Sequence, residues 1–431
     1  MSGAAAVAPH SPLQEWWQWL RRPDFWLPTA DTFAVLTAAS LPWSTTLVSI
    51  FSACWIGAAA MIVDYPAYFR SLKQPICALP LALFALAVIG TLWSETAWNA
   101  RIYAVGPAIK LLFLPGLFHY FERSQRGMWV FVAFLASCML LMATSWVALL
   151  EPSITLQHNP PTRGIFVKNY IDQSQEFTLL TMALAYPIHK LLLERRIWLA
   201  LLLLGIVLSL LINMIFVIVS RTAIVTIPIM LTVFAALHLR WRTSLMIFGA
   251  VVVLAGLSWV ASSQLRTTIN STSSQYQVYT ESNAVTSVGL RLEFWQKSLR
   301  FMKEAPLTGH GTGSTRGLFE RAAVGSPDLL ASDYVINNPH NQTLNVGVQW
   351  GMLGVVVLWA MWISHLLLFR GESFVAWIGL LVVVQNIFTS LFNSHIFDFH
   401  EGWMYVLGVG IAGGMVLKTR RADPSVGEGG S

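Results

Sequence analysis

Runs of about 20 apolar residues recur along almost the whole chain and constrain its fold more than any other feature. A helix that crosses the roughly 30 Å hydrocarbon core of a bilayer needs about 20 mostly apolar residues, because its backbone polar groups must be satisfied within the segment. The sequence predicts about twelve such spans, near residues 27–44, 45–63, 75–94, 102–121, 128–150, 174–193, 197–219, 221–239, 243–261, 342–369, 374–394 and 402–417. We therefore expect an all-α polytopic membrane protein with a large, partly helical loop between helices 9 and 10.

Composition supports a membrane protein over a soluble one. Hydrophobic residues make up 55% of the chain and charged residues 11%, whereas soluble domains carry about 25% charged residues. The formal net charge of +6 does not by itself predict a nucleic-acid partner, and none is expected. Cys54, Cys77 and Cys138 lie inside apolar runs without CxxC spacing, so neither a disulfide framework nor a thiolate metal site is predicted.

Basic residues are distributed unevenly between the two sets of loops that these spans create. Loops on the side of the N-terminus carry most of them, including Arg70 and Arg123, whereas the short opposite loops hold few, such as Arg101 and Arg163. Because short cytoplasmic loops are enriched in Lys and Arg, both termini are predicted to be cytoplasmic. The long loop 262–341 then faces the extracytoplasmic compartment.

The predicted spans divide the chain into segments. Residues 1–26 form a cytoplasmic or interfacial segment, in which the Trp-rich stretch Leu13–Leu20 predicts a helix lying in the membrane interface. The segments that follow are the spans 27–261, the loop 262–341, the spans 342–417 and a cytoplasmic tail 418–431. The end of the tail is rich in Gly, Ser and acidic residues, a composition typical of disorder.

The long loop contains segments of two kinds. Residues 269–287 are rich in Ser, Thr and Asn with few aliphatic anchors, and we expect this segment to be mobile. Arg291–Lys303 instead has apolar residues at helical spacing, which predicts an amphipathic helix packed on the membrane domain. The apolar positions of that helix are Leu292, Trp295, Leu299 and Met302.

Glycines dominate the segment that follows this helix. Pro306 ends the helix, and Gly309, Gly311 and Gly313 come directly after it. Glycine adopts left-handed backbone conformations and lets two backbones approach closely. We therefore expect a tight turn that packs closely on a neighbouring element.

His340 lies at the start of the tenth span, on the predicted extracytoplasmic face, in the run Asn337-Asn338-Pro339-His340-Asn341. A histidine titrates near neutral pH and can accept a proton from a sugar hydroxyl, so His340 is a candidate general base. At the same position it can instead cap the helix or hydrogen-bond the loop. Position alone leaves both interpretations open.

Two arginines near this face are candidates for binding phosphate. Ser220 precedes Arg221 at the start of the eighth span, where it can cap the helix and leave N-terminal amides for an anion. Arg291 begins the amphipathic loop helix and offers a second guanidinium fork, which binds phosphate oxygens in a bidentate manner that lysine cannot match. Interfacial snorkelling or salt bridging is the alternative for both arginines.

Lys110 lies near the middle of the fourth span. An unpaired ammonium there costs at least about 2.5 kcal/mol, so its side chain must face protein or water. One interpretation places Lys110 in the same polar cavity, bound to an anionic head group. The other pairs it with a buried acceptor such as Asn213.

Two polar loop segments carry ionisable residues that are expected to be solvated at the membrane interface. Their members are Arg163, Lys168, Asp172 and Glu176 after the fifth span, and Asn393, His395, Asp398, His400 and Glu401 after the eleventh. His395, Asp398 and His400 resemble metal ligands only superficially, because such groups at an interface are more often hydrated, and no metal or other cofactor is predicted. The sequence has no DxD pair, Walker loop or GxSxG elbow, so it lacks the usual parts for metal-dependent nucleotide-sugar transfer, ATP hydrolysis and serine hydrolysis.

Several short motifs together resemble the shared core of the O-antigen ligase and O-antigen polymerase superfamily. In chain order they are residues 220–223 (SRTA), 291–295 (RLEFW), 304–313 (EAPLTGHGTG), 340–345 (HNQTLN) and 351–354 (GMLG). Each motif is short, but their order and spacing are fairly specific. The layout of about twelve spans with a large loop before the last three is also similar to that family.

The resemblance implies a GT-C-like glycosyltransferase of the bacterial inner membrane with a periplasmic active site. The donor would be an O-antigen glycan on undecaprenyl diphosphate, and the acceptor a sugar hydroxyl of lipid A-core. By resemblance, His340 is the general base for metal-independent, inverting transfer, while Arg221 and Arg291 stabilise the diphosphate leaving group. Lys110, Ser220 and Asn341 are further candidates for substrate binding, and the surrounding lipids are the other expected partners.

Other functions remain open from sequence. An O-antigen polymerase passes the glycan to another lipid-linked glycan, and a protein O-oligosaccharyltransferase of the same superfamily passes it to a protein hydroxyl. A transporter of polyprenyl-linked glycans would also have many spans and an intramembrane lysine. The transporter interpretation gives no function to the long loop and its motifs.

Overall fold

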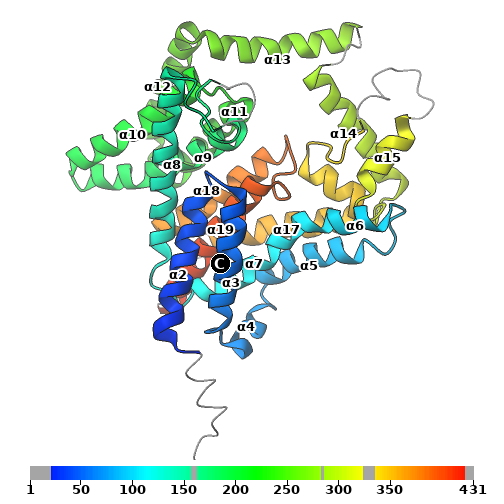
Figure 1. Cartoon of the computed structure of the whole chain (residues 1–431). Coiled ribbons are helices and arrows are strands. Elements are labelled where there is room, and N and C mark those ends of the chain that lie inside the picture. The colour runs from blue at the N-terminus through cyan, green and yellow to red at the C-terminus, as the bar shows by residue number, and fades with distance from the viewer. Residues whose placement is uncertain (1–20, 157–162, 283–285, 324–334, 423–431) are drawn as a thin grey trace, which may run out of the picture.

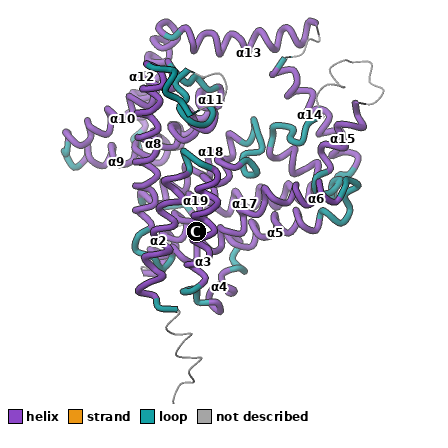
Figure 2. The backbone as a smooth tube through the Cα atoms, viewed as in Figure 1, coloured by secondary structure: helices purple, strands orange, loops and turns teal. Residues whose placement is uncertain are grey.

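The computed structural model describes residues 21–156, 163–282, 286–323 and 335–422. Within these ranges every regular element is a helix (Figures 1 and 2). The interfacial helix predicted at Leu13–Leu20 and the end of the tail lie outside the described residues.

The first half of the described chain alternates long helices with short connections. The helices are α2 (Pro23–Ser40), α3 (Thr45–Ala60), α4 (Tyr65–Ser71), α5 (Pro75–Ile89), α6 (Trp98–Val105), the 3₁₀ helix η1 (Gly106–Leu112), α7 (Phe113–Phe121), α8 (Gly127–Leu150), α9 (Tyr170–Leu193) and α10 (Ile197–Phe216). The second half contains α11 (Arg221–His238), α12 (Trp241–Ala261), α13 (Ser263–Ser282), α14 (Ser287–Glu304), α15 (Ser314–Ala323), α17 (Gln342–Leu368), α18 (Phe374–Thr389) and α19 (Phe399–Ala422).

Six helical stretches are long and apolar enough to cross a bilayer, which makes the protein a multi-pass membrane protein. They are Trp98–Phe121, Gly127–Leu150, Ile197–Phe216, Arg221–His238, Trp241–Ala261 and Gln342–Leu368. The shorter apolar helices α5 and α18 lie at two further predicted spans. Each of the remaining predicted spans also contains a helix, and the total of about twelve crossings stays a prediction.

Two predicted spans in the first half of the chain are not continuous α-helices. The span predicted at 45–63 ends with α3, and the chain bends by 118° into the short helix α4. Asp64 caps α4 by accepting a hydrogen bond from the amide of Ala67. Within the span predicted at 102–121, Gly106 and Pro107 begin the 3₁₀ helix η1, because proline cannot donate the backbone hydrogen bond that an α-helix needs there.

The core of the membrane domain forms around α19, which lies near the centre of Figure 1. Almost the whole length of α19 is buried, and glycines on it allow neighbouring helices to approach closely. A Cβ at Gly410 would meet Leu117 of α7 at 2.6 Å, and a Cβ at Gly413 would meet Phe118 at 2.3 Å. At the opposite extreme, α12 buries none of its residues against the described protein, as expected for a helix that faces lipid.

The long loop is more helical than the sequence indicates. The expectation of a mobile segment at 269–287 is not met, because the 20-residue helix α13 occupies Ser263–Ser282 and runs across the top of Figure 1. The predicted amphipathic helix is present as α14, where Thr286 caps the amide of Gly289 at 3.0 Å. Its ion pair between Glu293 and Lys297 measures 2.6 Å.

The buried face of α14 differs from the predicted one. Phe294, Ser298 and Phe301 are buried against α15 and the start of α17, whereas Leu299 is 50% exposed. Leu292 and Trp295 line a cavity, and Trp295 and Met302 also pack against the buried cluster around Phe294 and Phe301. The helical period was therefore predicted correctly, but Leu299 lies on the exposed side of the helix and not on the predicted packed side.

The glycine segment packs on α17 as a close backbone contact. Gly309, Gly311 and Gly313 have φ values of 64°, 88° and 79°, which other residues rarely adopt. The amides of His310 and Gly311 donate to the carbonyl oxygens of Val348 and Gln349, at 2.9 and 2.8 Å. The amide of Met352 donates to the carbonyl oxygen of Pro306 at 2.8 Å, which joins the motifs at 304–313 and 351–354 and attaches the loop to α17 where that helix kinks.

Candidate active site

A cavity of about 620 Å³ lies between the start of α11, the helix α13 and the helix α14. Its lining combines two arginines with mostly apolar and hydroxyl side chains. The lining residues are Arg221, Thr222, Ile224, Val225, Thr268, Ile269, Thr272, Ser273, Tyr276, Val288, Arg291, Leu292, Trp295 and Phe392. The fold thus brings the two candidate arginines, which are far apart in sequence, to one cavity.

Arg221 is the first residue of α11, where the helix dipole is positive. Its Nη2 donates to Ser271 Oγ of α13 at 3.3 Å. Ser220 occupies the N-cap position and is buried, but in the described chain its hydroxyl does not make the capping bond that the sequence predicts. The first turn of α11 also has no acidic residue, so the positive end of the helix and the guanidinium both favour an anion in the cavity.

Arg291 begins the second turn of α14 and faces the same cavity. Burial lowers the pKa of Arg291, and the nearby charge of Arg221 lowers this pKa further. An arginine nevertheless stays charged at physiological pH. Among the described residues no carboxylate forms an ion pair with either arginine, so salt bridging does not account for these two positive charges.

His340 precedes α17 in a left-handed backbone conformation, with φ of 54°. It is not the helix cap, because Asn341 occupies that position and accepts a hydrogen bond from the amide of Leu344 at 3.1 Å. The amide of His340 donates to Asn338 Oδ1 at 2.9 Å. This bond holds a backbone conformation that is uncommon for a residue with a side chain.

A chain of hydrogen bonds fixes the imidazole of His340. Its Nδ1 lies 3.0 Å from Asn393 Oδ1, and Asn393 Nδ2 donates to Asp398 Oδ2 at 2.6 Å. Asn338 Nδ2 donates to the same Asn393 oxygen at 2.8 Å, which agrees with this orientation of the amide. Because Asn393 Oδ1 can only accept, His340 Nδ1 carries the proton, and the lone pair lies on Nε2.

The charge state of His340 suits a base. Burial lowers the pKa of His340, and the positive charge of Arg291 lowers it further, while the hydrogen bond to Asn393 raises it. The net shift is downward, so the imidazole is neutral at pH 7. A neutral imidazole with a free Nε2 can accept a proton.

His340 lies at the edge of the cavity that the two arginines line. Trp295 lines the cavity and donates its indole N–H to the carbonyl oxygen of Pro339 at 3.1 Å. Phe392, another lining residue, directly precedes Asn393. The structure therefore places the imidazole beside the cavity, within electrostatic range of Arg291.

Lys110 is buried and does not line this cavity. Its Nζ donates to the carbonyl oxygens of Phe397, at 3.2 Å, and Asp398. The predicted pairing with Asn213 is wrong, because Asn213 hydrogen-bonds Ser145 at 3.0 Å. Lys110 thus holds the backbone of the segment that carries Asp398, and Asp398 is the last residue of the hydrogen-bonded chain from His340.

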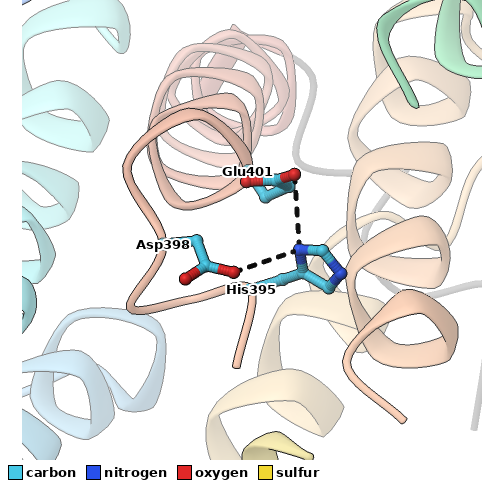
Figure 3. Close-up of side chains that lie close together, drawn as sticks. All are labelled: His395, Asp398 and Glu401. Carbon is cyan, nitrogen blue, oxygen red and sulfur yellow. Dashed lines mark ion pairs between the residues drawn. The ribbon is translucent and has the colours of Figure 1, made fainter. Parts of the chain in front are cut away.

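Several ionisable residues that were expected to be solvated are buried instead. His395 and Glu401, which lie side by side in Figure 3, are 2% and 5% exposed, and Glu176 of α9 is 0% exposed. His395 lies close to Asp398 and Glu401, while His400 faces Asp172 at 2.8 Å. The group that could hold a metal ion is therefore His395, Asp398 and Glu401, with Glu401 in the place where the sequence suggested His400.

Sequence reasoning missed the role of Asn393 in the site. It was noted only as part of a polar run, more than fifty positions after His340. The Asn-rich run before His340 was the one indication that amide side chains would organise this region. A contact between residues of two separate loops is set by the packing of α17 against α18, which local patterns do not encode.

Comparison with known proteins agrees with the motifs. Residues 206–359 match the family model described as O-antigen ligase. An uncharacterized protein of Haemophilus influenzae is 32% identical over 78 residues, which are 18% of this chain and 19% of that relative. The match thus spans about a fifth of the length of this curated relative. The matched stretch 206–359 includes Arg221, Arg291 and His340, so this part of the chain is similar to the O-antigen ligase family.

Proposed function

We propose that the protein is an O-antigen ligase at the periplasmic face of the bacterial inner membrane, with both termini in the cytoplasm. It transfers a glycan from undecaprenyl diphosphate to a sugar hydroxyl of lipid A-core. One observation carries the proposal: two arginines without carboxylate partners among the described residues line a cavity, and a neutral histidine with a free Nε2 lies at its edge.

The donor is held through its diphosphate. Arg221 and Arg291 offer guanidinium forks to the phosphate oxygens, and the N-terminal amides of α11 add to the positive field. Apolar lining residues, among them Ile224 and Val225 on α11, suit the start of the polyprenyl chain. Ser220 is buried at the N-cap of α11, Asn341 caps α17 and Lys110 is buried beside Asp398, and we assign the three to supporting the shape and field of the site.

The transfer step uses the energy already stored in the lipid diphosphate. His340 Nε2 takes the proton of the acceptor hydroxyl as the acceptor oxygen bonds to the anomeric carbon. The bond from that carbon to the phosphate oxygen breaks, and undecaprenyl diphosphate leaves with the electron pair. The two guanidinium groups stabilise the charge on the departing diphosphate. Direct attack inverts the anomeric configuration, and no metal ion takes part in the step.

Purified protein with both lipid substrates in detergent tests this proposal. His340→Ala is expected to lower the transfer rate by about 10² to 10⁴, the usual contribution of a general base. Arg221→Ala should lower it by about 10² to 10³, as for loss of one electrostatic stabiliser, and Arg291→Ala should have a severe effect of the same kind. Arg300→Ala is the matched control, because Arg300 is exposed on α14 and pairs only with Glu304.

The same assay separates the alternative functions. A transferase makes product without a sealed membrane, whereas a transporter makes none. Product on lipid A-core supports the ligase, while product formed only on a second lipid-linked glycan or on a protein hydroxyl would contradict it. Wild-type activity in His340→Ala would contradict the mechanism.

A further inference from the structure

A buried network of ionisable side chains lies around the start of α19, beside the site described above. Its members are Lys110, Lys168, Asp172, Glu176, His395, Asp398, His400 and Glu401. Lys168 pairs with Glu176 at 3.7 Å, and His400 faces Asp172 at 2.8 Å. Four members of the network are carboxylates and two are lysines. Buried charges without partners are costly.

Three members of this network, His395, Glu176 and His400, have buried polar atoms without a hydrogen-bond partner among the described residues, and His395 lies between two carboxylates. Its Nδ1 is buried and has no hydrogen-bond partner among the residues that the structure describes. It points between two carboxylates, 3.6 Å from Asp398 Oδ2 and 3.5 Å from Glu401 Oε1 (Figure 3). Both separations exceed the 2.7–3.2 Å or so of an N–H···O hydrogen bond.

These separations fit ligands that share a metal ion. For bonds of about 2.0–2.2 Å in a tetrahedral zinc site, neighbouring ligand atoms lie about 3.3–3.6 Å apart. The two distances from His395 Nδ1 match that spacing, and the three ligand atoms all lie within 4.8 Å of one another. A divalent cation would also bring positive charge to the carboxylates of Asp398 and Glu401.

Neighbouring amide side chains hydrogen-bond and orient both carboxylates of this group. Asn393 Nδ2 donates to Asp398 Oδ2 at 2.6 Å, and Gln175 Nε2 donates to Glu401 Oε1 at 3.0 Å. Hydrogen bonds of this kind orient the carboxylates that bind a metal. The side chain of Asp398 is 32% exposed, which leaves a path for the ion to enter.

We propose that His395, Asp398 and Glu401 bind one Zn²⁺ ion, with a fourth position open to water. One imidazole and two carboxylates suit zinc among the common divalent ions. The site goes beyond the proposed function, because Asn393 separates it from His340 and the ion touches no reacting atom. It joins the segment after α18 to the first turn of α19 and thereby steadies Asn393.

Metal analysis of the purified full-length protein tests the site directly. Protein prepared in detergent is treated with EDTA, desalted and titrated with ZnCl₂, and bound zinc is measured by mass spectrometry and calorimetry. We expect one zinc ion per chain, a higher thermal unfolding midpoint with zinc, and a tetrahedral visible spectrum when Co²⁺ replaces it. His395→Ala and Glu401→Gln should weaken zinc binding by about 100-fold or more. His400→Gln is the control and should retain zinc, because His400 faces Asp172 instead.

Two results would overturn the site. One is wild-type protein that takes up no zinc above background. The other is His395→Ala that elutes as a monodisperse species and binds zinc as the wild type does. Glycan transfer is measured in the same samples. Transfer without zinc uptake rejects only this site, and zinc uptake without transfer rejects only the proposed function.

Discussion

Replacing Asn393 by alanine tests whether the hydrogen-bonded chain behind His340 sets its function as a base. The variant removes the acceptor that lies 3.0 Å from His340 Nδ1 and leaves the cavity lining unchanged. Loss of one such bond is worth about 1 kcal/mol, which corresponds to about a fivefold fall in kcat if the bond holds the reactive tautomer. KM for the lipid-linked donor should change little, because Arg221 and Arg291 are untouched.

The pH dependence gives this prediction its second readout. The bond to Asn393 raises the pKa of His340, so its removal should lower that pKa further. A general base works in its deprotonated form, and therefore the acid limb of kcat/KM should move to lower pH although the plateau rate falls. Loss of folding alone would lower the rate without shifting the limb in this direction.

The assay is glycan transfer in detergent from about pH 4 to 8, a range that spans the ordinary titration of histidine. Asn337→Ala is the matched control, because Asn337 is an exposed asparagine in the same run. An acid limb that moves to higher pH, or a plateau rate equal to wild type, would refute the role assigned to Asn393.

Three further predictions follow from the same geometry. Arg291→Lys keeps the positive charge but loses the planar fork, so kcat/KM should fall by roughly tenfold or more, while Arg300→Lys should not change it. Transfer by folded, EDTA-treated protein should persist, with a loss of about fivefold at most if zinc steadies Asn393, and complete loss of transfer restored only by a divalent ion would contradict leaving-group stabilisation by arginines. Gly309→Ala should lower the free energy of unfolding by about 1–3 kcal/mol, measured by thermal unfolding, because its φ is 64° and its Cβ would lie 2.5 Å from the backbone of Gln349. Gly249→Ala is its control, since nothing lies within 4 Å of that Cβ.

Local sequence patterns predicted the helices well where the bilayer or a turn decides the structure. Apolar runs located the membrane helices, and the glycines after Pro306 located a turn with left-handed residues. The pattern failed for α13, whose Ser, Thr and Asn residues are poor helix formers with few apolar anchors. This helix is fixed at both ends by contacts with its neighbours, including Tyr279 against Gly289 of α14.

The sequence predicted only part of the candidate site, because it identifies single residues but not the partners that they contact. Arg221, Arg291 and His340 were selected individually by residue type and position, and the fold brings the two arginines to one cavity with the histidine at its edge. The partners of these residues were not predictable, because hydrophobic periodicity does not report which loops meet. Lys110 illustrates the limit: its burial required a partner, but the partner is a pair of backbone carbonyls that no side-chain pattern reveals.

The kink in α17 lies where the helix is attached to the segment after α14. Trp350 and Gly351 leave helical geometry, and the carbonyl oxygen of Pro306 accepts the amide of Met352 at 2.8 Å just beyond them. The carbonyl oxygens of Val348 and Gln349 before the kink and the amide of Met352 after it all bond the segment 306–311. The later turns of α17 pack in the core through Leu358, Met361 and Trp362, so we expect the start of α17, and with it His340, to keep its position relative to the core.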